Sequence, residues 1–166
     1  ILFACANQIN YHQNKHEMKI VILSIKQDLA NYLQRAFAKH MHDGVLCLPV
    51  QSPFYRFVSE KLYGHCHRTL VRPQGNLTLG FVSLGNSKNS AWYYQLGKEA
   101  TRELERMIDY RMRKDLYERM KEGRRKYGVT YVETVNRFMQ EYDIRGVTED
   151  AFLRGYRRKK AQNRLG

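Results

Sequence analysis

The sequence lacks the features that define several protein classes. No apolar run approaches the ~20 residues that a membrane-spanning helix needs, so we expect no membrane partner. Cysteine occurs only three times and never with CxxC spacing, which argues against a disulfide framework and favours a reducing, cytoplasmic location. The chain has no glycine-rich phosphate loop, no defensible Ser-His-Asp order and no evident pair of catalytic carboxylates. The sequence therefore favours a protein without enzymatic activity and indicates no cofactor.

Acidic residues are scarce relative to basic ones. The 166-residue chain has 29 lysines and arginines against 16 aspartates and glutamates, which gives a net charge of +13. A surplus of this size favours a polyanionic partner, and we expect nucleic acid, with duplex DNA as the first choice. Hydrophobic residues make up 43% of the chain, which is enough for a buried core.

Strand and helix patterns alternate in the first half of the chain. Residues 1–17 precede the regular apolar run that begins at Met18, and we expect them to be a non-native or disordered N-terminal extension. Over residues 18–84 the order is strand, helix, strand, helix, strand, which predicts a small α/β subdomain. The polar loop 85–90 predicts the boundary of this subdomain.

A helical part is predicted over residues 91–166. Residues 98–125 have the pattern of one long helix, because apolar residues recur every four positions and no glycine or proline intervenes before Gly123. Acids interleave with the basic residues of its outer face, so we expect helical ion pairs there. The stripe is longer than a small domain needs, which favours a homodimer through this helix. It comprises Ala100, Leu104, Ile108, Met112, Leu116 and Met120.

Residues 130–160 have the pattern of a helix-turn-helix. Thr130 is placed to cap the first helix, Gly146 lies in the turn with the freedom to adopt a left-handed conformation, and Thr148 is placed to cap the second helix. The predicted fold is thus α+β: a small mixed β-sheet with two helices, then the long helix and a helix-turn-helix-like hairpin. We expect DNA phosphates to be contacted by Arg145, Arg154, Arg157, Arg158, Lys159, Lys160 and Arg164.

Two acids modify the expected mode of DNA binding. Glu149 and Asp150 stand at the start of the second helix, which is the part of a recognition helix that usually meets the bases. The sequence therefore favours phosphate contact by the C-terminal half of this helix, with weak sequence preference. It also predicts that truncation after Gly155 abolishes DNA binding and leaves the fold intact.

A short histidine motif leaves an enzymatic alternative open. His65-Cys66-His67 resembles the metal-binding strand of single-strand nickases and relaxases, in which two histidines hold a divalent cation and a tyrosine attacks the phosphodiester. The resemblance implies a metal-dependent nickase in which His65 and His67 bind the metal and Tyr110 or Tyr117 is the nucleophile. The alternative interpretation is a polar loop or strand end with exposed histidines.

Two further clusters have a structural and a functional interpretation. His40 and His42 could form a zinc site with Cys47 and the pair His65 and His67, although the spacing matches no common zinc finger or ribbon. A histidine-rich loop at a helix C-terminus is favoured instead. The run Trp92-Tyr93-Tyr94 could stack single-stranded bases, but packing against the sheet is favoured.

The chain from about Tyr93 onward is similar to small proteins of bacterial phages and of transposable or conjugative elements. The similarity rests on the long helix, on the phrase from Val135 to Ile144, and on the acidic cap followed by Tyr-Arg-Arg-Lys. It implies a DNA-handling accessory protein of a mobile element, either a transcriptional regulator or an architectural factor. A basic structural component of a phage particle is the remaining interpretation.

Overall fold

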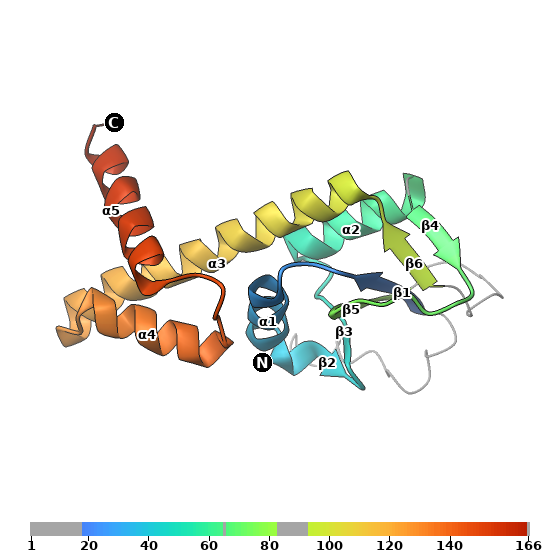
Figure 1. The fold of residues 1–166 in the computed structure, drawn as a ribbon, viewed down its shortest axis with the longest axis horizontal. Helices are drawn as coiled ribbons and strands as arrows, with labels where there is room; N and C mark the ends of the chain where they lie inside the picture. Colours follow the sequence, from blue (N-terminus) through green and yellow to red (C-terminus); the bar gives the residue numbers. More distant parts are fainter. Residues whose placement is uncertain (1–17, 65, 83–92, 166) are drawn as a thin grey trace, which may run out of the picture. The chain divides into compact units, whose positions relative to one another are not determined.

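The computed structural model describes residues 18–64, 66–82 and 93–165, and its architecture is α+β (Figure 1). The predicted extension 1–17 and the predicted boundary loop 85–90 lie outside the described residues. Within the described ranges, the chain forms one mixed sheet and five α-helices, which confirms the fold class that the sequence predicts.

The sheet is centred on the first strand of the chain. β1 pairs antiparallel with β5, from Met18 opposite Val82 to Leu23 opposite Leu77, and it runs parallel to β6 on its other side. The described strands have the order β2-β3-β5-β1-β6-β4. They are β1 (Met18–Leu23), β2 (Met41–His42), β3 (Val45–Leu46), β4 (Cys66–Thr69), β5 (Leu77–Val82) and β6 (Tyr93–Leu96).

The last two helices begin at the capping residues that the sequence predicts. The Thr130 hydroxyl accepts the N–H of Glu133 at 3.2 Å, and the Thr148 hydroxyl accepts the N–H of Ala151 at 3.3 Å. Each bond satisfies a donor that the first turn of a helix leaves unpaired. The helices are α1 (Gln27–Ala36), α2 (Pro53–Gly64), α3 (Lys98–Tyr127), α4 (Tyr131–Tyr142) and α5 (Glu149–Leu165), with a short 3-10 helix, η2 (Ala38–His40), after α1.

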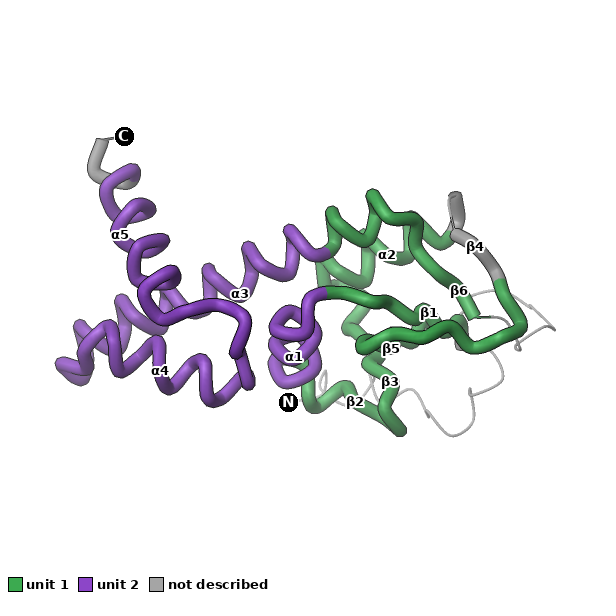
Figure 2. Tube along the Cα trace, viewed as in Figure 1, with its two compact units in different colours: residues 1–25, 37–104 green, residues 26–36, 105–166 purple. Residues whose placement is uncertain are grey.

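The chain divides into two compact units (Figure 2). Unit 1 contains the sheet, α2 and the first residues of α3 up to Leu104. Unit 2 contains α1, the rest of α3 from Glu105, α4 and α5. α1 follows β1 directly in the sequence, yet it groups with the C-terminal helices and not with the strands around it.

Unit 1 is stabilised by apolar residues of its central strands and of α2. Val21 of β1 and Leu79 of β5 are each 0% exposed. α2 packs against β4 and β6 and buries Phe54 and Val58. The sheet therefore has the apolar core that the hydrophobic content of the chain allows.

The apolar stripe of α3 is buried within the single chain. Five of its six residues, Leu104, Ile108, Met112, Leu116 and Met120, are each 0% exposed, and Ala100 is half-buried. Side chains that are already buried offer no apolar surface to a second copy. The length of the stripe, which favoured a homodimer in the sequence, therefore does not support one in the structure.

The outer face of α3 carries helical ion pairs, as the interleaved charges predict. Each pair joins residues four positions apart, so the two side chains lie on neighbouring turns of the helix. These basic residues are therefore partly compensated by acids on the same helix. The pairs are Arg111 with Asp115, Lys114 with Glu118, and Lys126 with Glu122.

A buried tyrosine joins α1 to α3 and α4 within unit 2. Tyr32 is 1% exposed, and its ring centroid lies 5.0 Å from that of Tyr142. Its hydroxyl donates to the carboxylate of Asp115, which also pairs with Arg111 at 2.9 Å. Burial first, and then the hydrogen bond and charge of Asp115, raise the pKa of Tyr32 well above its usual value.

We expect Tyr32 to make stability fall at high pH. Because its pKa is higher in the folded chain than in the unfolded one, its contribution is complete below pH ~10 and is lost as the pH rises further. This group should remove up to about 1.4 kcal/mol of unfolding free energy for each pH unit. Tyr32→Phe should remove that part of the slope. Urea denaturation of both proteins near neutral pH and above pH ~10 measures this pH dependence of the unfolding free energy. An equal pH dependence in the two proteins would contradict the prediction.

Candidate nucleic-acid interface

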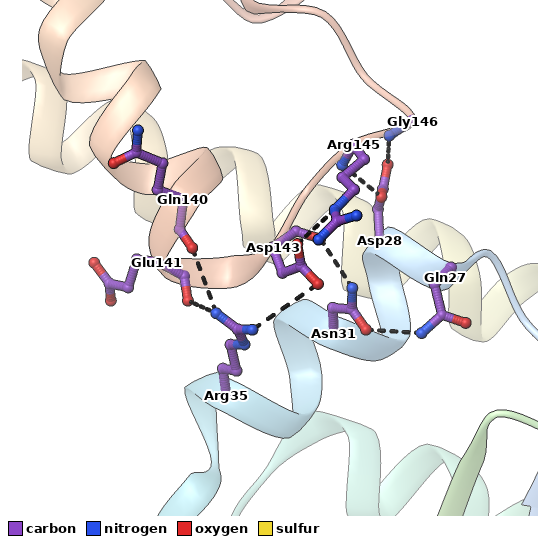
Figure 3. A network of polar contacts seen from close by, with 9 residues as sticks. All are labelled: Gln27, Asp28, Asn31, Arg35, Gln140, Glu141, Asp143, Arg145 and Gly146. Atoms are coloured by element: carbon purple, nitrogen blue, oxygen red, sulfur yellow. Dashed lines mark hydrogen bonds and ion pairs between the residues drawn. The ribbon is translucent and has the colours of Figure 1, made fainter.

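The turn between α4 and α5 is held by α1, which comes from a distant part of the sequence (Figure 3). The Asp28 carboxylate accepts the backbone N–H of Arg145 at 2.9 Å and that of Gly146 at 2.8 Å. The Asn31 amide donates to the backbone carbonyl of Asp143 at 2.9 Å. Three backbone groups of the turn are thus bonded to side chains of α1, which ties the turn that precedes α5 to this helix.

α1 also contacts the end of α4. The Arg35 guanidinium donates to the backbone carbonyls of Gln140 at 3.4 Å and of Glu141 at 2.5 Å (Figure 3). The last carbonyls of a helix have no partner within it and carry partial negative charge, so a cation there is favourable. Arg35 therefore caps α4 from another helix.

The left-handed residue of the turn is Asp143, and Gly146 does not use the freedom to adopt that conformation. Asp143 has φ 50° and ψ 52° and terminates α4, whereas Gly146 is not among the residues with positive φ. Gly146 is required for a different reason. A Cβ at that position would lie 2.7 Å from Oδ2 of Asp28, so a side chain would disturb the contact with α1.

α5 is anchored by an aromatic contact at its middle. Phe152 is 0% exposed, and the ring of Tyr156 lies 5.3 Å from that of Tyr117 and 5.1 Å from that of Tyr131. Truncation after Gly155 would remove Tyr156 from this packing as well as the basic residues beyond it. Substitution of single charges is therefore a cleaner test of binding than the truncation.

The predicted DNA-contacting residues fall into two groups. Arg145 lies 2.7 Å from a carboxylate oxygen of Asp143, and Arg154 lies 3.0 Å from one of Asp150. Their charges are partly compensated in the folded chain. Arg164 lies outside the residues whose side chains are described. Among the described side chains, no carboxylate lies within 4.0 Å of the remaining four, Arg157, Arg158, Lys159 and Lys160.

One flank of α5 forms a hollow with the end of α3 and the start of α4, here named the α4-side hollow. Its volume is about 470 Å³, and Arg157 and Lys160 of α5 lie at its rim with Arg124 of α3. The remaining lining is mostly apolar and aromatic. The complete lining is Arg124, Thr130, Tyr131, Val132, Leu153, Tyr156, Arg157 and Lys160.

The opposite flank of α5 forms a second basic hollow with α3, here named the α3-side hollow. Its volume is about 550 Å³, and it receives Arg158 and Lys159. The Lys159 ammonium lies 5.4 Å from the centre of the Tyr117 ring, and Tyr110 is 67% exposed. The lining is Tyr110, Arg113, Lys114, Tyr117, Gly155, Arg158, Lys159 and Gln162. The four uncompensated cations are therefore divided equally between two sides of one helix.

The residues of the nickase interpretation are only partly described. His65 lies outside the described residues, and His67 pairs through its backbone with Gln95 of β6, while its side chain is not described. Of the two candidate nucleophiles, Tyr117 is 9% exposed and Tyr110 is 67% exposed. Only Tyr110 of these two presents its ring to solvent.

The two remaining candidate sites are the cluster of His40, His42 and Cys47 and the run Trp92-Tyr93-Tyr94. Within the part of the chain that the structure describes, which includes His40, His42 and Cys47, no group of three potential ligands is arranged to hold a metal ion. Burial raises the pKa of the Cys47 thiol. Trp92 lies outside the described residues, and Tyr94 is 8% exposed in β6, in keeping with packing against the sheet.

Two parts of the interface could not be found by local sequence patterns. The contact between Asp28 and Arg145 joins residues 117 positions apart, and no spacing rule connects them. Arg124 has the pattern of an ordinary outer-face residue of α3, but it lies at the rim of the α4-side hollow. The signal that could have suggested Asp28 is its place in the first turn of α1, where a carboxylate is common.

Comparison with protein-family models, with curated proteins and with solved structures finds no match to this chain. None of the described helices combines the length and the apolar character that crossing a membrane requires. The similarity to proteins of phages and mobile elements therefore stays a prediction from the sequence.

Proposed function

We propose that this protein binds duplex DNA through phosphate contacts made by the C-terminal half of α5, as a regulator or architectural factor. The observation that supports this most strongly is the distribution of Arg157, Arg158, Lys159 and Lys160 over both flanks of one helix, with no carboxylate within 4.0 Å of them among the described side chains. A setting in a mobile element and a cytoplasmic location belong to the same proposal and rest on the sequence.

The two flanks fit the geometry of a duplex. The major groove is about 12 Å wide and admits one α-helix, with a phosphate backbone on either side. A helix in that groove would present Arg157 and Lys160 to one strand and Arg158 and Lys159 to the other. α4 would support it, and α1 would set its direction through the turn.

The start of α5 limits base reading. Glu149 and Asp150 occupy its first turn, and the Asp150 carboxylate pairs with Arg154. Carboxylates near the bases and phosphates repel DNA, so the proposed contact relies on the C-terminal half of the helix. Binding should accordingly have little sequence preference and a strong dependence on salt.

A salt titration tests this function directly. Fluorescence anisotropy of a labelled blunt duplex, measured between roughly 50 and 200 mM salt, should give a log-log slope of about −4, because each neutralised phosphate contributes about −0.9. Duplexes of unrelated sequence should bind with similar affinity. A slope near zero, or no binding at the lowest salt, would overturn the proposal.

A further inference from the structure

The α4-side hollow combines two chemical properties in one place. Its rim carries three cations, Arg124, Arg157 and Lys160, from two different helices. None of the three has a carboxylate within 4.0 Å among the described side chains; Arg124 instead donates to the Gly128 carbonyl at 3.5 Å, at the limit of a hydrogen bond. Its other lining is apolar or aromatic, and Val132 is 46% exposed there.

The aromatic part of the lining is held in position. Tyr131 and Tyr156 meet edge to face with ring centroids 5.1 Å apart, and Tyr156 also packs on Tyr117. Burial first, and then a hydrogen bond with Tyr131, raise the pKa of Tyr156. Its hydroxyl therefore stays neutral near pH 7 and does not repel an anion. The two tyrosine rings, packed on each other, therefore line the same hollow as the three cations.

These properties select a ligand with a flat apolar body and more than one negative charge. Three cations around an apolar surface match a phosphate chain attached to an aromatic ring. The volume of about 470 Å³ lies within the roughly 300–1,000 Å³ of small-molecule sites. The first turn of α4 adds the positive end of its dipole to the same side.

We propose that the α4-side hollow binds one phosphorylated nucleoside, with the base against Tyr131, Tyr156 and Val132 and the phosphates between Arg124, Arg157 and Lys160. Such a group can come from an unpaired nucleotide at the end of a DNA strand or from a free nucleotide. This site goes beyond the proposed contact of α5 with duplex phosphates, because Arg124 and the tyrosines have no part in that contact.

The first measurement compares two ligands that share a phosphate chain. Isothermal titration of the full chain with deoxyadenosine triphosphate should show binding about tenfold tighter than with inorganic triphosphate, because only the nucleotide carries a base to stack. Equal affinities for both would overturn the proposal, since the hollow would then be a phosphate site alone.

The second measurement compares two neighbouring cations. Arg124→Gln should weaken deoxyadenosine triphosphate binding about tenfold, whereas Arg125→Gln, an equal charge change one residue away and outside the lining, should leave it within about twofold. Val132→Asp adds a carboxylate at an exposed position of the lining and should abolish binding without disturbing the core. Equal effects of the two arginine variants would contradict the site.

Binding to two DNA duplexes distinguishes a strand end from a free nucleotide as the source of the ligand. If a strand end is the ligand, a duplex with a 5′ overhang should bind more tightly than the blunt duplex, and Arg124→Gln should abolish the difference. If a free nucleotide is the ligand, deoxyadenosine triphosphate should bind and the two duplexes should bind equally. Failure of both arms overturns the proposal. If both arms fail but the blunt duplex still binds, the proposed function of α5 stands. If the nucleotide binds but the blunt duplex does not, only the proposed function of α5 is overturned.

Discussion

Replacing Arg157, Arg158, Lys159 and Lys160 together with glutamine should weaken binding to a blunt duplex roughly 4,000-fold at about 0.1 M salt. Each phosphate contact contributes about 0.9 to the log-log salt slope, so each lost contact costs roughly eightfold at this salt concentration. The slope itself should fall from about −4 to near zero. All four residues belong to α5 and border the two hollows, so their exchange leaves the buried anchor Phe152 in place.

The control for this variant has the same change in net charge. It replaces four cations of unit 2 that are already paired with carboxylates, and these should contribute much less to a bound phosphate. We expect a loss of less than about tenfold. A loss as large as that of the α5 variant would show that net charge alone drives binding, and the assignment to α5 would be wrong. The control residues are Lys126, Arg137, Arg145 and Arg154.

The second large effect concerns the contact between α1 and the turn. Asp28→Ala should lower the unfolding free energy by about 3 kcal/mol, because two hydrogen bonds to a charged acceptor are lost together. The N–H groups of Arg145 and Gly146 would lose their partner. Denaturant unfolding followed by circular dichroism measures the change, and hydrogen exchange should show faster exchange of those two amides.

Two substitutions on α1 calibrate this result. Asp28→Asn keeps one acceptor oxygen and should cost about half as much as Asp28→Ala. Gln27→Ala removes only an exposed side-chain hydrogen bond to Asn31 and should alter the unfolding free energy by less than about 0.5 kcal/mol. If Asp28→Ala costs no more than Gln27→Ala, the turn is held by other contacts and α1 does not set the start of α5.

Local chemistry made much of the fold predictable. Thr130 and Thr148 cap helices where the sequence places them, because a cap involves residues within three positions of one another. The apolar residues that recur every four positions from Leu104 to Met120 are buried, because a helix brings such positions onto one face. Ion pairs on α3 follow from the same geometry, because residues four positions apart lie on neighbouring turns.

Predictions from the sequence were weaker wherever a residue was judged by its neighbours in the chain alone. Gly146 has the freedom to adopt the left-handed conformation, but Asp143 adopts it and Gly146 instead permits close approach of Asp28. The length of the α3 stripe favours a dimer surface in the sequence, because spacing alone does not show which parts of the same chain cover it. Its burial shows that the other parts of one chain already cover it.

The sequence by itself determined the α+β class, the starts of the last three helices and the basic character of α5, since these depend on composition and on spacings of a few residues. Only the tertiary structure decided that α1 holds the turn before α5, that Arg145 and Arg154 are paired with acids, and that Arg124 joins Arg157 and Lys160 around one hollow. These features depend on how separate elements pack, and packing brings together residues whose separation in the chain has no regular period. The sequence shows which residues are charged, but only the fold shows which of these charges are paired with an opposite charge.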